Sequence, residues 1–199
     1  MFFKKDKRKG PYAATTEDLL QISRKYSLQK GKGYIVEDPQ AAFSYDIFVN
    51  LISTESKKGE RLTGFVISRQ HQDLLRERFG LEKTPITWLA TQAGENSLDP
   101  TSLGMLAHAV VDFISKTKNG IVLLDGVEYL ITNNDFRKVM RILEQMNDAV
   151  MHYKSRIIIP LDPRAFDIKE LAILERNFEI ISPKRGISGF PGSNGSRRK

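Results

Sequence analysis

Cysteine is absent from this chain of 199 residues. Its absence excludes disulfides, thiolate zinc sites, iron–sulfur clusters and cysteine nucleophiles. Histidine is scarce: the chain has His71, His108 and His152, and no two of them have the spacing of a metal-binding pair. We therefore expect neither a metal site nor a cofactor, and the lack of thiols fits a reducing compartment.

Long hydrophobic runs are also missing. No stretch approaches the roughly 18 apolar residues of a membrane-spanning helix. The first residues, Met1 to Phe3, are followed by lysines rather than by the apolar segment of a secretory signal. These features predict a cytoplasmic protein.

The sequence lacks the motifs of the common nucleotide and acyl-transfer enzymes. It has no Gly-x4-Gly-Lys-Ser/Thr loop for phosphates, no Gly-x-Gly-x2-Gly turn for a dinucleotide, and no Gly-x-Ser-x-Gly elbow. We therefore predict that the protein is not an enzyme.

Positive charge is concentrated at the two ends. Residues 1–33 carry nine Lys/Arg against three acids, a net charge of +6, and residues 182–199 carry a net charge of +5. Since the whole chain has a formal charge of +7, residues 34–181 carry −4. This asymmetry predicts three parts: a basic N-terminal arm with a short helix (1–32), an α/β domain (33–181) and a basic Gly/Ser-rich C-terminal tail (182–199).

Clustered lysines and arginines on flexible segments bind phosphate backbones through counterion release. We expect the ends to bind RNA, DNA or a ribonucleoprotein, with a protein partner or an anionic membrane surface as alternatives. The candidate nucleic-acid-binding residues are Lys4, Lys5, Lys7, Arg8, Lys9, Lys30, Lys32, Lys184, Arg185, Arg197, Arg198 and Lys199.

Between the ends, short apolar runs alternate with segments of helical periodicity. This pattern predicts βαβ units, and hence a three-layer α/β/α fold, RecA-like or Rossmann-like, around a mostly parallel sheet of about six strands. The expected strands lie at 34–36, 65–67, 86–90, 121–124, 156–159 and 178–181, and Trp88 is expected in the core.

Capping residues predict where several helices begin. Thr15 starts a helix in the N-terminal arm, and Asp99 before a proline is expected to cap the helix that follows it. Asn134 or Asp135 precedes the longest helical pattern, and Asp167 with Glu170 predicts a capping box.

Ligands of open α/β sheets bind beyond the carboxyl ends of the strands. The candidate residues in this crevice are Glu37, Asp38, Arg69, Asp125, Gly126 and Asp162. Two interpretations stay open: the carboxylates hold a cation or act as acid and base, or they cap turns and helices.

The segment ending at Asp125 resembles the strand of P-loop ATPases that places an aspartate beside Mg²⁺. Its partner loop is missing, because residues 37–42 contain two acids and a proline but no glycine or lysine. Such a loop repels a triphosphate and offers few amide donors, which predicts a pseudo-ATPase.

Three segments resemble the archaeal family catalogued as domain of unknown function 835. They are residues 83–89 (KTPITWL), residues 124–130 (LDGVEYL) with 133–136 (NNDF), and residues 160–163 (PLDP). The resemblance covers about residues 33–181 and implies an archaeal source and a RecA/KaiC-like fold without a phosphate-binding loop. It supplies no catalytic residues.

These observations together predict a non-catalytic binding or regulatory module that docks a polyanionic or ribonucleoprotein partner through its basic ends. One alternative is a nucleotide- or metal-binding sensor or enzyme that uses the carboxylates of the crevice. Another is a protein-interaction module in signalling.

Overall fold

The computed structural model describes residues 28–57, 62–117 and 119–183. Seven strands form one sheet in the order β4-β3-β2-β5-β6-β1-β7, and every neighbouring pair is parallel. Their bounds are β1 Lys32–Glu37, β2 Thr63–Ser68, β3 Ile86–Leu89, β4 Ser97–Leu98, β5 Gly120–Asp125, β6 Arg156–Leu161 and β7 Glu179–Ile181. The predicted parallel α/β fold is confirmed, and β4 is the strand that the sequence pattern missed.

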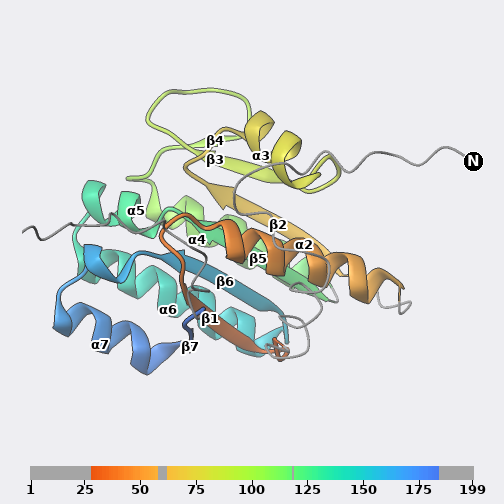
Figure 1. The fold of residues 1–199 in the computed structure, drawn as a ribbon. Helices are drawn as coiled ribbons and strands as arrows, with labels where there is room; N and C mark the ends of the chain where they lie inside the picture. Colours follow the sequence, from red (N-terminus) through yellow and green to blue (C-terminus); the bar gives the residue numbers. More distant parts are fainter. Residues whose placement is uncertain (1–27, 58–61, 118, 184–199) are drawn as a thin grey trace, which may run out of the picture.

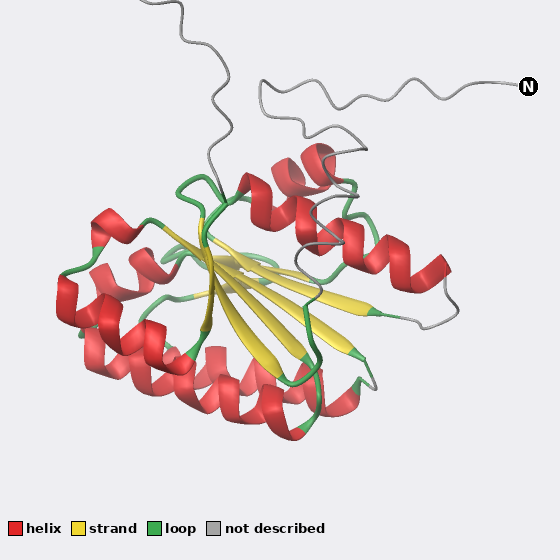
Figure 2. Ribbon diagram, turned by 60° about the horizontal axis from the view of Figure 1, so that its bottom comes forward, coloured by secondary structure: helices red, strands yellow, loops and turns green. Residues whose placement is uncertain are grey.

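Helices cover both faces of the sheet (Figures 1 and 2). One face carries α2 (Ala42–Lys57) and α3 (Gln72–Phe79), and the other carries α4 (Leu103–Lys116) and α6 (Phe136–His152). The shorter elements are α5 (Val127–Asn133), the 3-10 turn η1 (Pro163–Ala165) and α7 (Ile168–Asn177). The molecule therefore has the three layers that the alternating pattern predicts.

The central strands supply both hydrophobic cores. In β5, Ile121 and Leu123 point into the core under α2 and α3, whereas Val122 and Leu124 point into the core under α4 and α6. All four side chains are fully buried. A continuous apolar run is therefore required here, because each face of the strand is covered.

The predicted starts of two helices are confirmed. The Asp135 carboxylate accepts a hydrogen bond from the Arg137 amide at 2.9 Å, at the start of α6. Asp167 and Glu170 form a capping box at the start of α7. In both helices a side chain supplies the acceptor that the first backbone N–H groups lack.

The predicted cap at Asp99 is wrong. Helix α4 begins at Leu103 after Ser102, and the Asp99 carboxylate instead accepts from the amide and hydroxyl of Thr101 in a turn. These two hydrogen bonds lower the pKa of Asp99. This turn follows directly after β4, which ends at Leu98.

Trp88 is not a core residue, contrary to the sequence-based prediction. It is half-buried near the edge of the sheet, where only the two-residue strand β4 lies beyond β3. Its indole N–H donates to the carbonyl oxygen of Arg69 at 3.1 Å, and its ring meets the His71 ring edge-on with centroids 5.0 Å apart.

Both charged ends and the helix predicted from Thr15 lie outside the described residues, apart from Lys30 and Lys32. Among the residues that the structure describes, no helix has the length and apolar character needed to cross a bilayer.

Candidate functional site at the carboxyl edge of the sheet

All strands run in one direction, so their carboxyl ends share one edge of the sheet. The structure places the predicted crevice residues along this edge, with Glu37 at the end of β1 opposite Leu161 in the register. Ser68 is the register partner of Asp125, and the Arg69 amide donates to the Asp125 carbonyl at 3.1 Å. Along the same edge, at the ends of β1 and β6, the Asp38 amide donates to the Leu161 carbonyl at 3.0 Å.

Asp125 ends β5 and is enclosed by hydrogen-bond donors. Its Oδ2 accepts from the Ser68 hydroxyl at 2.8 Å, the Tyr45 hydroxyl at 3.1 Å and the Gln70 side-chain amide at 3.3 Å. Burial raises the pKa of Asp125, and the three donors oppose that rise. Asp125 thus links β2, α2 and the loop after β2, instead of facing solvent.

Tyr45 completes this buried group from the first turn of α2. Its side chain is fully buried, and its ring stacks on Phe79 at 4.3 Å between centroids. Burial, with the Asp125 charge adding to it, raises the pKa of Tyr45. The phenol therefore stays protonated at neutral pH and donates to the carboxylate.

Asp38 occupies the start of α2. Its Oδ2 accepts from both the backbone N–H of Ser44, at 2.9 Å, and the Ser44 hydroxyl, at 3.0 Å. Ala41 precedes the helix with φ +56° and carries no polar side chain that could cap it. A helix N-terminus attracts anions through its unpaired N–H groups. Here the chain's own carboxylate binds at that position.

Asp162 follows β6 and is also paired. Its carboxylate accepts from the Arg164 amide and forms two-oxygen contacts with the Arg164 guanidinium, the shortest 2.6 Å. Its backbone N–H donates to the Glu128 carboxylate at 2.7 Å. Burial raises the pKa of Glu128, partly offset by this hydrogen bond. Glu128 was not predicted from the sequence.

Arg69 and Gly126 lie between the ends of β2 and β5. The Arg69 guanidinium stacks on the Tyr129 ring, 4.4 Å from its centroid, and donates to the Leu89 carbonyl at 3.2 Å. Gly126 has φ +131°, a conformation that L side chains rarely adopt, and a Cβ there would lie 3.3 Å from Leu89 Cδ1. Glycine is therefore required where α5 begins.

These contacts decide between the two interpretations for part of the crevice. Asp38 and Asp162 cap a helix and a turn, whereas Asp125 bridges elements through hydroxyl groups. Within the described ranges, no three His, Asp or Glu side chains are grouped so that they could hold a metal ion.

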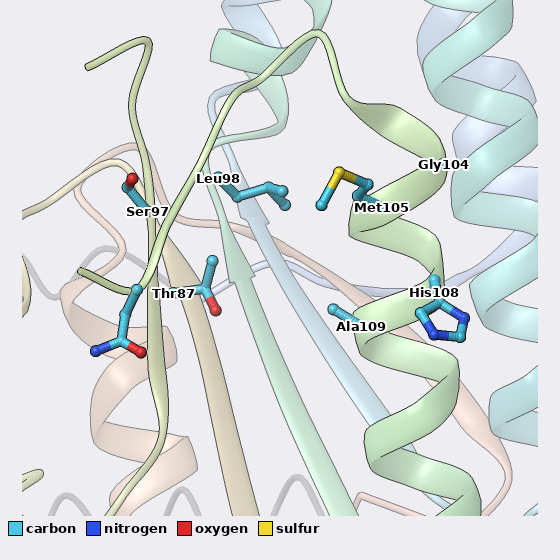
Figure 3. Close-up of a pocket in the computed structure, with 8 residues that line it drawn as sticks. Thr87, Ser97, Leu98, Gly104, Met105, His108 and Ala109 are labelled. Atoms are coloured by element: carbon cyan, nitrogen blue, oxygen red, sulfur yellow. The ribbon is translucent and has the colours of Figure 1, made fainter. Parts of the chain in front are cut away.

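A separate open pocket of about 410 Å³ lies between the β3–β4 edge and α4. Figure 3 shows Met105 pointing toward Leu98, and Ala109 toward Thr87, across it. The pocket is lined by Thr87, Asn96, Ser97, Leu98, Gly104, Met105, His108 and Ala109, and none of these is a predicted site residue.

A family model described as "Protein of unknown function (DUF835)" matches residues 45–178. The chain belongs to this family. The family recognised in the sequence is therefore confirmed. The matched segment of this DUF835 protein includes Tyr45, Asp125 and Glu128, whereas Asp38 precedes it. No curated protein sequence matches the chain.

Solved structures similar to this DUF835 protein include a KaiC-like protein from the hyperthermophilic archaeon Pyrococcus horikoshii OT3. It is 12% identical with a TM-score of 0.47, and the match covers 66% of this chain and 62% of that one. Domain III of the Thermotoga maritima replication initiation protein DnaA is 12% identical with a TM-score of 0.43, covering 82% and 59%. The chain thus spans about three fifths of each, and the likeness concerns the fold alone.

Two of the predicted basic residues are described. Lys32 forms an ion pair with Glu179 at 2.7 Å, which raises the pKa of the exposed lysine. Lys30 is exposed nearby. Both lie at the amino edge of the sheet, because β1 begins at Lys32. They are therefore not part of the crevice, and the other predicted basic residues lie outside the described part of this DUF835 protein.

Sequence reasoning missed the roles of Tyr45 and Glu128. The Tyr45–Asp125 hydrogen bond joins residues 80 positions apart, and that between Glu128 and Asp162 joins residues 34 apart. A sequence signal existed only for Glu128, which lies in the LDGVEYL segment. Tyr45 had no sequence signal of its own.

Proposed function

We propose that this DUF835 protein is a non-catalytic binding module that holds a polyanionic partner, RNA, DNA or a ribonucleoprotein, through its basic ends. The observation that supports it best is the pairing of the carboxylates at the carboxyl edge. Asp38 is bonded to the Ser44 amide and hydroxyl where α2 begins, so a carboxylate already occupies the position that would receive a phosphate.

The Asp125 environment supports the same conclusion. Ser68, Tyr45 and Gln70 all donate to Asp125 Oδ2, so this oxygen is not available to a Mg²⁺ ion. Burial raises the pKa of Asp125, so the charged form that a divalent cation binds is less favourable here than in water. We therefore assign Asp125 a structural role in joining α2 to the sheet.

The charge distribution supports a polyanionic partner. The ends carry net charges of +6 and +5, while residues 34–181 carry −4. An acidic body gives no general attraction for nucleic acid, so the ends supply the electrostatic affinity.

A salt titration tests this proposal. The affinity of the whole chain and of a variant lacking residues 1–12 and 183–199 is measured for a labelled single-stranded oligonucleotide at several salt concentrations. We expect the deletion to flatten the plot of log affinity against log salt, by about 0.7 for each lost phosphate contact.

A matched control keeps both ends at full length but replaces their lysines and arginines by glutamine. It should reproduce the flattened slope if charge is responsible. The same slope in the whole chain and in both variants would contradict the proposal.

A further inference from the structure

Four side chains with flat faces gather at the carboxyl ends of β2, β3 and β5. We call Arg69, His71, Trp88 and Tyr129 the aromatic–arginine cluster. Arg69 contacts both Trp88 and Tyr129. The Arg69 backbone carbonyl accepts from the Trp88 indole at 3.1 Å, and the Arg69 guanidinium stacks on the Tyr129 ring, 4.4 Å from its centroid. His71 lies edge-on to Trp88 at 5.0 Å.

The cluster is both held in place and accessible. The Trp88 hydrogen bond fixes the indole, and the Leu89 carbonyl accepts from Arg69 Nη1 at 3.2 Å. Arg69 is exposed, while His71, Trp88 and Tyr129 are half-buried. Rings fixed before binding lose little conformational entropy when a ligand stacks on them.

The chemistry of these groups selects a ligand with flat aromatic rings and negative charge. Unpaired bases stack on tryptophan, tyrosine and histidine rings and on arginine planes, and arginine also binds phosphate. A duplex hides the faces of its bases. Resting on the proposed function, we propose that the aromatic–arginine cluster binds the bases of single-stranded nucleic acid, while the basic ends bind the backbone.

The C-terminal end of the chain leaves the fold at the same edge as the cluster. Strand β7 is parallel to β1 and pairs Ile181 with Val36, so the chain continues from the carboxyl edge. The strand order places β3 five strand spacings from β7, about 24 Å at about 4.8 Å per spacing. Residues 184–199 have an extended length of about 50 Å, which spans that distance.

The acid in direct contact with the cluster is Asp73, whose Oδ2 lies 3.4 Å from His71 Nδ1. Asp162 is paired with Arg164, Asp38 with the start of α2, and Asp125 with three neutral donors. The Arg69 guanidinium contacts the Tyr129 ring and the Leu89 carbonyl and supplies the positive charge of the cluster.

Trp88 is the single tryptophan of the chain, so tryptophan fluorescence reports on the cluster directly. The full-length protein is titrated with 15-nucleotide oligo(U), oligo(dT) and a duplex of the same length. We expect saturable quenching with the single strands and little with the duplex. Comparing oligo(U) with oligo(dT) separates RNA from DNA preference, and either one supports the proposal.

Variants give the second readout, the anisotropy of a labelled oligonucleotide. We expect Trp88→Ala and Arg69→Ala each to weaken single-strand binding about tenfold and to leave duplex binding unchanged. Trp88→Phe keeps a stacking ring and should lose less. Tyr153→Ala and Arg141→Ala, exposed residues of the same kinds elsewhere on the fold, serve as controls and should bind as the unaltered chain does.

Thermal melts verify that each variant is folded, and Arg69→Ala tests the cluster even if Trp88→Ala fails to fold. Single-strand binding by Arg69→Ala within twofold of the unaltered chain, with no quenching of Trp88 fluorescence in the unaltered chain, would overturn this inference. If deleting the basic ends still flattened the salt dependence in that case, the proposed function would be kept and only the role of the aromatic–arginine cluster would be lost. Absence of any nucleic-acid binding would overturn both.

Discussion

Replacing Asp38 by alanine removes the acceptor of two hydrogen bonds at the start of α2. Both donors belong to Ser44, whose backbone N–H and hydroxyl lie 2.9 and 3.0 Å from Asp38 Oδ2. Ser44 is fully buried, so its hydroxyl does not readily exchange this partner for water. The substitution thus tests whether the carboxylate is an integral cap.

The size of the effect follows from these two contacts. A buried donor left without a partner costs about 1–3 kcal/mol, and loss of a helix cap costs about 0.5–2 kcal/mol. Asp38 is itself half-buried, which lets water reach part of the vacated space. We therefore expect the free energy of unfolding to fall by about 2 kcal/mol, which lowers Tm by about 4–8 °C for a chain of this size.

Urea denaturation at pH 7, followed by circular dichroism, measures the change. Asp38→Asn retains one acceptor oxygen and should lose less than Asp38→Ala. The matched control is Asp99→Ala, which removes a carboxylate from an exposed turn and should cost about 0.5 kcal/mol or less.

A double-mutant cycle with Ser44→Ala isolates the pair. If Asp38→Ala and Ser44→Ala contribute through the same contacts, their combined cost is smaller than the sum of the single costs. Equal losses in Asp38→Ala and Asp99→Ala, or additive effects in the cycle, would refute the assignment of Asp38 as the cap.

Two further predictions concern the ends of β5 and the start of α5. Burial raises the pKa of Asp125 above its ordinary value of 3.8, so the folded state binds this proton more tightly than the unfolded state. Stability therefore falls as pH rises from about 4 through the raised pKa, and Asp125→Asn removes this dependence. In urea melts from pH 3.5 to 8, the free energy of unfolding of Asp125→Asn should rise relative to that of the unaltered chain as the pH increases. Parallel curves of unfolding free energy against pH would argue against a raised pKa. Gly126→Ala places a side chain at φ +131° and should lower the free energy of unfolding by about 1–3 kcal/mol. The control is Gly104→Ala in α4, where a Cβ would meet nothing within 4 Å. That substitution should be neutral or stabilising by up to about 1 kcal/mol. Thermal melts that show equal costs for the two would refute the strain argument.

Local patterns predicted the elements that depend on local physics. The apolar run of β5 and the 3.6-residue stripe of α6 were recognised because full burial leaves no place for a polar residue there. The capping box of Asp167 was recognised because both partners lie within one turn.

Features that depend on distant segments could not be predicted. Trp88 has the apolar character of a core residue, and its half-burial follows from strand order, which places only β4 beyond β3. Asp99 before a proline has the local signature of a helix start, but β4 ends just before it and the helix begins later. The Tyr45–Asp125 contact joins segments 80 residues apart.

The sequence therefore predicted which residues lie at the crevice, but not the hydrogen bonds and ion pairs that they form. Parallel strands bring their ends to one edge, which placed Asp38, Asp125 and Asp162 together. Their partners, Ser44, Tyr45 and Arg164, decide whether those carboxylates remain available, and only the folded structure shows them.

Calorimetry with ATP and Mg²⁺ tests the central claim most directly, that paired carboxylates leave no triphosphate site at the carboxyl edge. Our account predicts no Mg²⁺-dependent binding of ATP, GTP or cyclic nucleotides. Binding through the aromatic–arginine cluster would be the same with and without Mg²⁺ and in Asp125→Ala. Saturable binding of ATP that is abolished by Asp125→Ala would contradict our account.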